Sequence, residues 1–67
     1  MILLTINGKE HRLKEPMDIT AYLKSLGIGT NRVAVAYNGT VLQKKELCHV
    51  VLSDGDEVEI VEAVGGG

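Results

Sequence analysis

Cys48 and His49 are the adjacent residues whose types most suggest catalysis, because a thiolate can act as a nucleophile and an imidazole as its base. On a strand the two side chains would point in opposite directions, and on a helix neighbouring residues do not face each other. The sequence places no Asn or Asp to orient the histidine ring. We therefore expect a half-buried Cys48 and a surface His49, neither of them catalytic.

The other polar clusters also lack the spacing of known sites. His11 and His49 are too far apart in sequence to form the close ligand pair typical of zinc, and the acidic run 54–57 lacks the spaced oxygen ligands of a calcium loop. Gly27 and Gly29 follow the expected helix, whereas a phosphate-binding loop precedes one. We therefore expect a solvated turn at 54–57, no metal site and no bound cofactor.

Residues 63–67, with the sequence Ala-Val-Gly-Gly-Gly, have a chemical use of their own. Glycine has no Cβ, so an extended end at Gly66 and Gly67 can pass through a narrow channel in another protein. Five residues reach at most about 17 Å, enough to place the Gly67 carboxylate in a partner's active site. A carboxylate is a poor electrophile until it is adenylated, so the partner must use ATP. A frayed end or an expression scar is the alternative.

The residues before this tail must form the body that presents it. The 67 residues leave room for one domain, which we place at 1–62, with 63–67 as a flexible tail. A net charge of −2 and only two aromatic residues argue against a nucleic-acid surface. No apolar run approaches the roughly 20 residues that span a membrane, and the single Cys48 cannot form an internal disulfide. We expect a soluble, cytoplasmic protein that is monomeric by itself.

Periodicity predicts the order of the elements in this body. Alternating residues indicate strands, each Asn-Gly pair indicates a tight hairpin turn, and Asp18 and Gly27 have the types expected at the two ends of a helix. The expected elements are strands at 2–6 and about 9–13, a helix between Asp18 and Gly27, strands at 33–37 and 41–42, a turn or short helix at 44–47, and a strand at 57–62.

The apolar stripe of the helix determines the fold class. Ile19, Tyr22, Leu23 and Leu26 recur at helical spacing, so one face of the helix must pack on the sheet. The first and last strands are both rich in Ile, Leu and Val, and we expect them to pair in parallel at the centre of the sheet. This is an α+β domain with the β-grasp, or ubiquitin-like, fold: a small mixed sheet with one helix on one face.

With these elements in place, the sequence resembles the ThiS family of sulfur carrier proteins, within the ThiS/MoaD group of ubiquitin-like carriers. The resemblance covers essentially the whole chain and is carried by residues 32–39 (RVAVAYNG), 52–61 (LSDGDEVEIV) and 63–67 (AVGGG). Many members have Arg-x-x-Trp where this chain has Lys44-Lys45-Glu46-Leu47. We expect Leu47 to fill the apolar site and Lys44 to keep the charge.

The resemblance implies a chemistry for the tail. A ThiF- or MoeB-like enzyme adenylates Gly67 with ATP, and sulfur from a donor of the cysteine desulfurase type then displaces AMP to leave a C-terminal thiocarboxylate. The thiocarboxylate gives its sulfur to thiazole synthase for the thiazole of thiamine. The chain would be a carrier and not an enzyme. Gly67 would carry the sulfur, Gly66 and Gly65 would permit threading, and Val61, Ala63 and Val64 would form the partner interface, with Val61 equally able to be core.

Three other functions remain open at this stage. The chain could be a MoaD-like small subunit of molybdopterin synthase, although such chains tend to be longer and richer in Phe, which is absent here. It could be a ubiquitin-like protein modifier that is conjugated to lysines through Gly67. It could also be a plain interaction module in which the terminal glycines are incidental.

Overall fold

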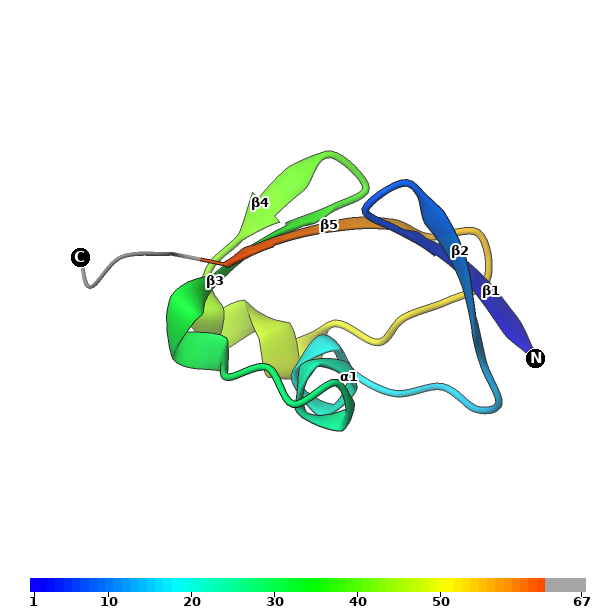
Figure 1. Ribbon diagram of the computed structural model, residues 1–67, viewed down its shortest axis with the longest axis horizontal. Coiled ribbons are helices and arrows are strands. Elements are labelled where there is room, and N and C mark those ends of the chain that lie inside the picture. The colour runs from blue at the N-terminus through cyan, green and yellow to red at the C-terminus, as the bar shows by residue number, and fades with distance from the viewer. Residues whose placement is uncertain (63–67) are drawn as a thin grey trace.

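The structure, a computed structural model, describes residues 1–62. These residues form one mixed sheet, one α-helix and two short 3₁₀ helices (Figure 1). The predicted α+β class is confirmed. The tail 63–67 lies outside the described residues, so the predicted division of the chain at residue 62 stays a prediction. The elements are β1 (Ile2–Ile6), β2 (Lys9–Leu13), α1 (Ile19–Ser25), the 3₁₀ helix η1 (Thr30–Arg32), β3 (Val33–Tyr37), β4 (Thr40–Leu42), the 3₁₀ helix η2 (Lys44–His49) and β5 (Glu57–Glu62).

The sheet has the strand order β2-β1-β5-β3-β4, which places the last strand in the middle. β1 and β5 pair in parallel, as predicted, while β5 runs antiparallel to β3. The parallel register is short, because it joins Thr5 to Glu57 and Ile6 to Val58 before β1 ends. The antiparallel register continues to the end of β5, where Val33 lies opposite Glu62.

Both Asn-Gly pairs form the predicted hairpin turns. The φ angles are 51° and 81° at Asn7 and Gly8, and 48° and 87° at Asn38 and Gly39. Two consecutive positive φ angles are the requirement of a type I′ turn, whose twist matches that of the flanking strands.

Local hydrogen bonds define both ends of α1. The Asp18 carboxylate accepts the N–H of Ala21 at 2.7 Å, which confirms the predicted N-cap. At the other end Gly27 has a φ of 76°, its N–H donates to Lys24, and the N–H of Ile28 donates to the carbonyl of Leu23 at 2.9 Å. These two bonds form a Schellman motif, so Gly27 ends the helix as predicted.

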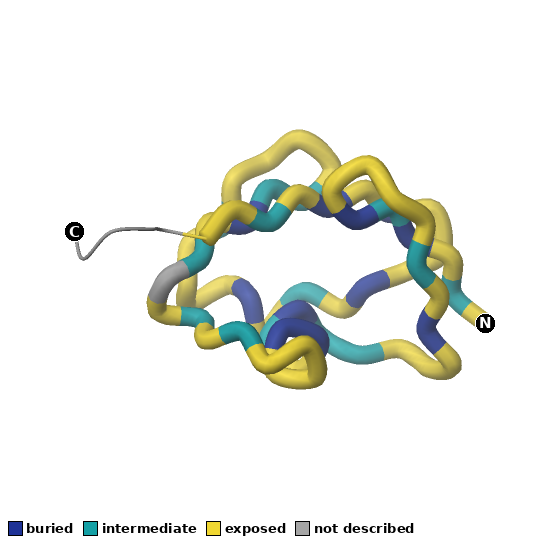
Figure 2. The backbone as a smooth tube through the Cα atoms, viewed as in Figure 1, coloured by how far each residue is buried: buried dark blue, intermediate teal, exposed yellow. Residues whose placement is uncertain are grey.

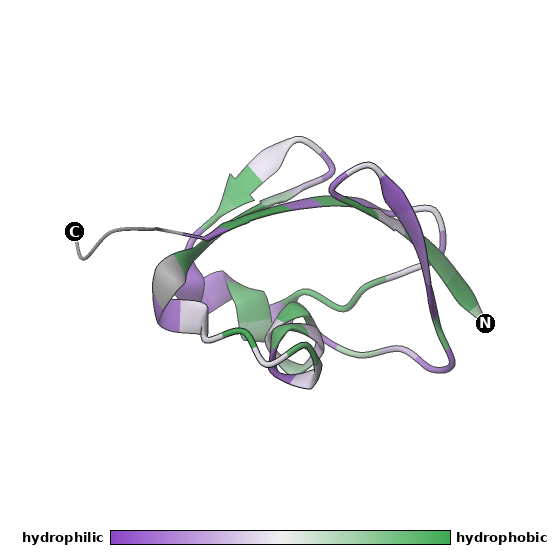
Figure 3. Ribbon diagram, in the orientation of Figure 1, coloured by the Kyte–Doolittle hydropathy of each residue, from purple (hydrophilic) through white to green (hydrophobic). Residues whose placement is uncertain are grey.

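The core lies between α1 and the face of the sheet that α1 covers (Figure 2). Figure 3 shows hydrophobic residues in the central strands and in α1, the two layers that enclose it. Leu47 of η2 is 2% exposed, as expected from its position in the sequence. The buried hydrophobic residues are Leu4, Ile6, Leu13, Ile19, Tyr22, Leu23, Val35, Leu47, Leu52 and Val58.

Two expectations about burial were wrong. Leu26 is 48% exposed, because α1 ends at Ser25 and Leu26 belongs to the cap that turns the chain away from the core. The turn at 54–57 is not fully solvated, since Asp56 is only 9% exposed. The Asp56 carboxylate accepts hydrogen bonds from the Tyr37 hydroxyl at 2.6 Å, the Ser53 N–H at 2.8 Å and the Asn38 side chain at 3.2 Å.

These hydrogen bonds determine the charge state of Asp56. Burial by itself would raise the pKa of Asp56, but the donors on Tyr37, Ser53 and Asn38 outweigh it and lower this pKa below its usual value. The same contact, followed by partial burial and the negative charge of Asp56, raises the pKa of Tyr37. Asp56 is therefore a buried carboxylate that ties the start of β5 to β3.

Candidate functional site

The predicted site begins where β5 ends. Glu62 is the last residue that the structure describes, and β5 delivers the chain to it from the middle of the sheet. Of the predicted site residues, Ala63, Val64, Gly65, Gly66 and Gly67 lie outside the described residues, so their roles stay predictions. The arrangement of β5 shows that whatever follows Glu62 leaves from a strand held within the sheet.

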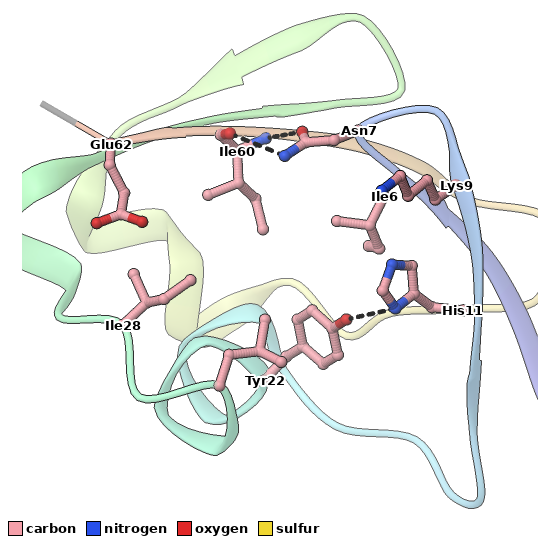
Figure 4. A pocket seen from close by; sticks show the side chains of 9 residues that line it. Ile6, Asn7, Lys9, His11, Tyr22, Ile28, Ile60 and Glu62 are labelled. Atoms are coloured by element: carbon pink, nitrogen blue, oxygen red, sulfur yellow. Dashed lines mark hydrogen bonds between the residues drawn. The ribbon is translucent and has the colours of Figure 1, made fainter.

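Asn7 holds β5 on the side from which β1 has departed. The backbone N–H of Asn7 donates to the carbonyl of Val58 at 2.9 Å. Its side chain then pairs with both backbone groups of Ile60: Oδ1 accepts the Ile60 N–H at 2.7 Å, and Nδ2 donates to the Ile60 carbonyl at 3.2 Å (Figure 4). Sequence reasoning treated Asn7 only as a turn residue and missed this contact, because the two partners are 53 residues apart.

The face of the sheet opposite α1 carries small and exposed apolar side chains. Val61 is 62% exposed and Val41 is 73% exposed, so Val61 does not belong to the core. Ala34 lies opposite Val61, and Ala36 lies opposite both Val41 and Glu59, which puts all of them on one face. We call Ala34, Val41 and Val61 the outer patch. The predicted role of Val61 in a partner interface stays a prediction, consistent with its exposure.

A cavity of about 400 Å³ opens on the other face, between the sheet and the end of α1 (Figure 4). The Tyr22 hydroxyl lies there, 3.5 Å from Nδ1 of His11, and burial raises the pKa of Tyr22. Apolar side chains such as Ile6 and Ile28 line the cavity together with the polar groups of Lys9, His11 and Glu62. The lining residues are Ile6, Asn7, Lys9, His11, Tyr22, Leu26, Ile28, Ile60 and Glu62.

Cys48 and His49 lie at the end of η2, away from this cavity. Cys48 is exposed, so the expectation of a half-buried thiol was wrong. The short 3₁₀ helix turns Leu47 toward the core and leaves Cys48 on the solvent side, where its Sγ lies 3.8 Å from the carbonyl of Lys45. His49 is exposed, as expected.

Residues 1–62 contain neither a cluster of metal-binding side chains nor a helix that could span a membrane. No group of three or more His, Cys, Asp or Glu side chains comes together there in a way that could hold a metal ion. Across the same residues, α1 and the 3₁₀ helices are all too short to cross a membrane. The candidate site is the end of β5, from which the chain continues into the predicted tail.

The sheet order, the parallel β1–β5 pair and the single covering helix define a protein of the β-grasp, or ubiquitin-like, class, as predicted. A crystal structure of a thiamine biosynthesis protein (ThiS) from Geobacter metallireducens superposes with a TM-score of 0.83 at 33% identity, covering 98% of this chain and 100% of that one. The sequence model of the ThiS family matches residues 3–67. The chain belongs to the ThiS family.

Curated relatives include proteins of two different lengths. A thiazole synthase of Paramagnetospirillum magneticum is 39% identical over 64 residues, which are 96% of this chain and 20% of that protein. The chain thus spans about a fifth of the length of the thiazole synthase that it matches. An uncharacterized protein of Porphyra purpurea is 33% identical over 66 residues, which are 98% of this chain and 93% of that protein.

Proposed function

We propose that this chain is a sulfur carrier protein for the formation of the thiazole of thiamine, and that it carries sulfur as a thiocarboxylate on Gly67. The observation that carries the proposal is the family match, which extends through the terminal glycines at residues 65–67. The fold supports it, because the central strand β5 leads directly to the tail. Because β5 is fixed within the sheet, a partner could bind the sheet surface while the tail after β5 enters that partner's active site.

The proposed chemistry takes place at the last carbon of the chain. The Gly67 carboxylate attacks the α-phosphorus of ATP, and pyrophosphate leaves, which gives an acyl adenylate. The terminal sulfur of a persulfide then attacks the acyl carbon, and AMP leaves. A thiol cleaves the resulting S–S bond to release the thiocarboxylate. In each of these reaction steps the catalytic groups belong to a partner protein, so the chain acts as a carrier and not as an enzyme.

The proposed partners follow from these steps. A ThiF- or MoeB-like enzyme supplies the adenylation, a donor of the cysteine desulfurase type supplies the sulfur, and thiazole synthase accepts it. The thiazole synthase of Paramagnetospirillum magneticum supports the last of these, because it contains a segment similar to this chain. Joining two interacting units in one polypeptide raises their effective concentration, so the arrangement suits a carrier and its acceptor.

The proposed contact surface is the outer patch together with Ala63 and Val64. Val41 and Val61 expose most of their side chains on the face next to the end of β5. Exposed apolar groups gain free energy when a partner removes them from water, and small neighbours such as Ala34 let the partner's backbone approach closely. Glu57 and Glu59 lie on the same face and would form its polar rim.

Intact mass spectrometry tests the proposal directly. The purified chain is incubated with a ThiF-type adenylating enzyme, ATP, cysteine and a cysteine desulfurase, and we expect the mass gain of one oxygen replaced by sulfur. The matched control is the chain without Gly66 and Gly67, which should gain nothing. An unchanged mass with several adenylating enzymes would overturn the proposal.

A gene deletion separates the alternatives. A thiamine requirement supports the proposed role, whereas loss of molybdoenzyme activity would point to a MoaD-like subunit. Isopeptide adducts in lysate that disappear without Gly66 and Gly67 would indicate a protein modifier. A phenotype that is the same with and without the last two glycines would indicate an interaction module.

A further inference from the structure

The edge of β5 that faces β1 loses its strand partner before β5 ends. Along this edge the backbone groups of alternate residues point toward β1: the Thr5 N–H donates to Asp56 at 2.9 Å, and the Asn7 N–H donates to Val58 at 2.9 Å. The next residue with this orientation is Ile60. β1 has turned away there, because the hairpin at Asn7 and Gly8 leads into β2.

The Asn7 side chain takes the place of the missing strand residue. A carboxamide offers one acceptor and two donors in a plane, so it can pair with a backbone N–H and C=O as a peptide group does. Oδ1 and Nδ2 of Asn7 make both contacts to Ile60, at 2.7 Å and 3.2 Å (Figure 4). On its opposite edge β5 is paired with β3, where Val35 lies opposite Ile60. Asn7 thus extends two-sided support to within two residues of Glu62.

Asn38 provides a natural comparison, because it occupies the same position in the other hairpin. Its Oδ1 accepts the Glu57 N–H at 2.8 Å, and its Nδ2 donates to Asp56 at 3.2 Å. Both asparagines have a positive φ and both make two side-chain hydrogen bonds to β5 or the turn before it. They differ in place: Asn38 holds the start of β5, five residues before Glu62, and Asn7 holds its end.

We infer that Asn7 is a positioning residue for the C-terminal tail. Its side chain holds the end of β5 at Ile60, and it thereby sets the point and the direction in which the chain leaves the sheet after Glu62. This inference rests on the proposed function. A partner that binds both the sheet and the tail gains affinity when the strand between them is already ordered, because less conformational entropy is lost on binding. Within the described part of the chain, the Asn7 side chain bonds to Ile60, so the role that we assign to it is positioning and not catalysis.

The experiment compares Asn7→Gly with Asn38→Gly in the full chain. Glycine keeps the positive φ and removes two side-chain hydrogen bonds in each case, so the two variants are matched. The first measurement is hydrogen exchange of the Ile60 amide by NMR. The second is the apparent KM and kcat for each chain as substrate of a ThiF-type enzyme with ATP, read as pyrophosphate release at a temperature where all chains are folded.

We expect Asn7→Gly to speed exchange at Ile60 and to raise the KM by roughly two- to tenfold, the range that one net hydrogen bond corresponds to. Since the partner orders the tail once it is bound, kcat should change little. Asn38→Gly should leave both the Ile60 exchange and the KM near their original values. Asn7→Asp keeps the acceptor for the Ile60 N–H and should restore part of the loss.

The possible failures are distinguishable. Equal KM values for the two glycine variants, with the original chain well adenylated, would overturn the positioning role and leave the proposed function standing. Unchanged exchange at Ile60 in Asn7→Gly would overturn it as well. If the original chain is not adenylated at all, the proposed function fails and the positioning role fails with it.

Discussion

Several polar side chains of this domain hold β5 and the turn before it in place. Asp56 is buried and accepts three hydrogen bonds, from Tyr37, Asn38 and Ser53, at the start of the strand. Asn7 pairs with Ile60 near its end. These side chains stabilise the fold, which agrees with the proposal that the reacting group is the C-terminal carboxylate and not a side chain.

Replacing Asp56 by Asn should lower the free energy of unfolding at neutral pH and should reduce how much this free energy falls in acid. The folded state lowers the pKa of Asp56, so the ionised carboxylate contributes stability that is present at neutral pH and is lost as the pH falls below about 4. Asn removes the charge and leaves donors unpaired, at a cost of about 1–3 kcal/mol. Urea unfolding at pH 7 and pH 3 measures both effects.

Tyr37→Phe is the companion variant, because it removes one of the donors that lower the pKa of Asp56. We expect it to weaken the acid dependence in part, and Asp56→Asn to weaken it more. An Asp56→Asn chain that loses as much stability between pH 7 and pH 3 as the original chain would contradict this account.

Gly66→Val should block sulfur loading without affecting the fold. A Val side chain would clash with the narrow partner channel that the proposed function requires, and misplacement of a reacting atom by about 1 Å costs roughly a hundredfold in rate. Thermal unfolding followed by circular dichroism should be unchanged, while intact mass spectrometry should show little loading.

Gly29→Ala is the control for that substitution. A Cβ at Gly29 would meet nothing within 4 Å, and its φ of −78° suits any residue, so this variant should fold and load normally. Normal loading of Gly66→Val would show that the tail does not pass through a narrow channel.

At the scale of elements, the strands and helix are defined by signals at their own ends. Asn-Gly forms each type I′ turn, and Asp18 and Gly27 mark the two ends of α1. A helix of seven residues is too short to be stable by itself in water, so its caps and its packing on the sheet must both contribute.

Asp18→Ala should therefore lower the free energy of unfolding by about 0.5–2 kcal/mol, since it removes the acceptor for the Ala21 N–H. Chemical denaturation monitored by circular dichroism gives this value. Lys24→Ala, on the exposed side of the same helix, is the control and should change stability by less than about 0.5 kcal/mol. Equal stability of the two variants would argue against the capping bond.

At the scale of the whole molecule, a single thin core supports everything else. It lies in one layer between α1 and the sheet (Figure 2), and Leu47 of η2 is part of it. A chain of this length has a stability on the order of 3–10 kcal/mol, from about 0.05–0.15 kcal/mol per residue. One large cavity in the core can therefore remove most of it.

Leu23→Ala is the variant that tests this limit. Leu23 is fully buried at the centre of the core, and such truncations cost about 2–5 kcal/mol. We expect a lower melting temperature with much of the chain unfolded at 37 °C, seen by circular dichroism and by loss of dispersed NMR signals. Val41→Ala, on the outer patch, is the control and should melt like the original chain. If Leu23→Ala melted at the same temperature as the original chain, the core would tolerate a large cavity, and this account of its limited stability would be wrong.

The sequence predicted the parallel pairing of β1 and β5, but it did not predict which individual side chains meet across long separations. Asn7 was recognised as a turn residue from Gly8 beside it, but its bond to Ile60 spans 53 positions. The acidic run at 54–57 suggested full solvation, whereas Asp56 is buried and accepts hydrogen bonds from Tyr37 of β3 and from Asn38 in the turn after it. The exposure of Cys48 depends on how η2 turns as it packs Leu47 inward.

The sequence by itself determined the element order, the turns, the caps and the glycine tail, because each depends on residues within a few positions of one another. The match of residues 3–67 to the ThiS family agrees with that interpretation. Only the tertiary structure decided how β5 is held, because that requires knowing where β1 ends beside it. The parallel pairing of β1 with β5 stops at Val58, and beyond it the Asn7 side chain makes the hydrogen bonds to Ile60 that a further strand residue would have made.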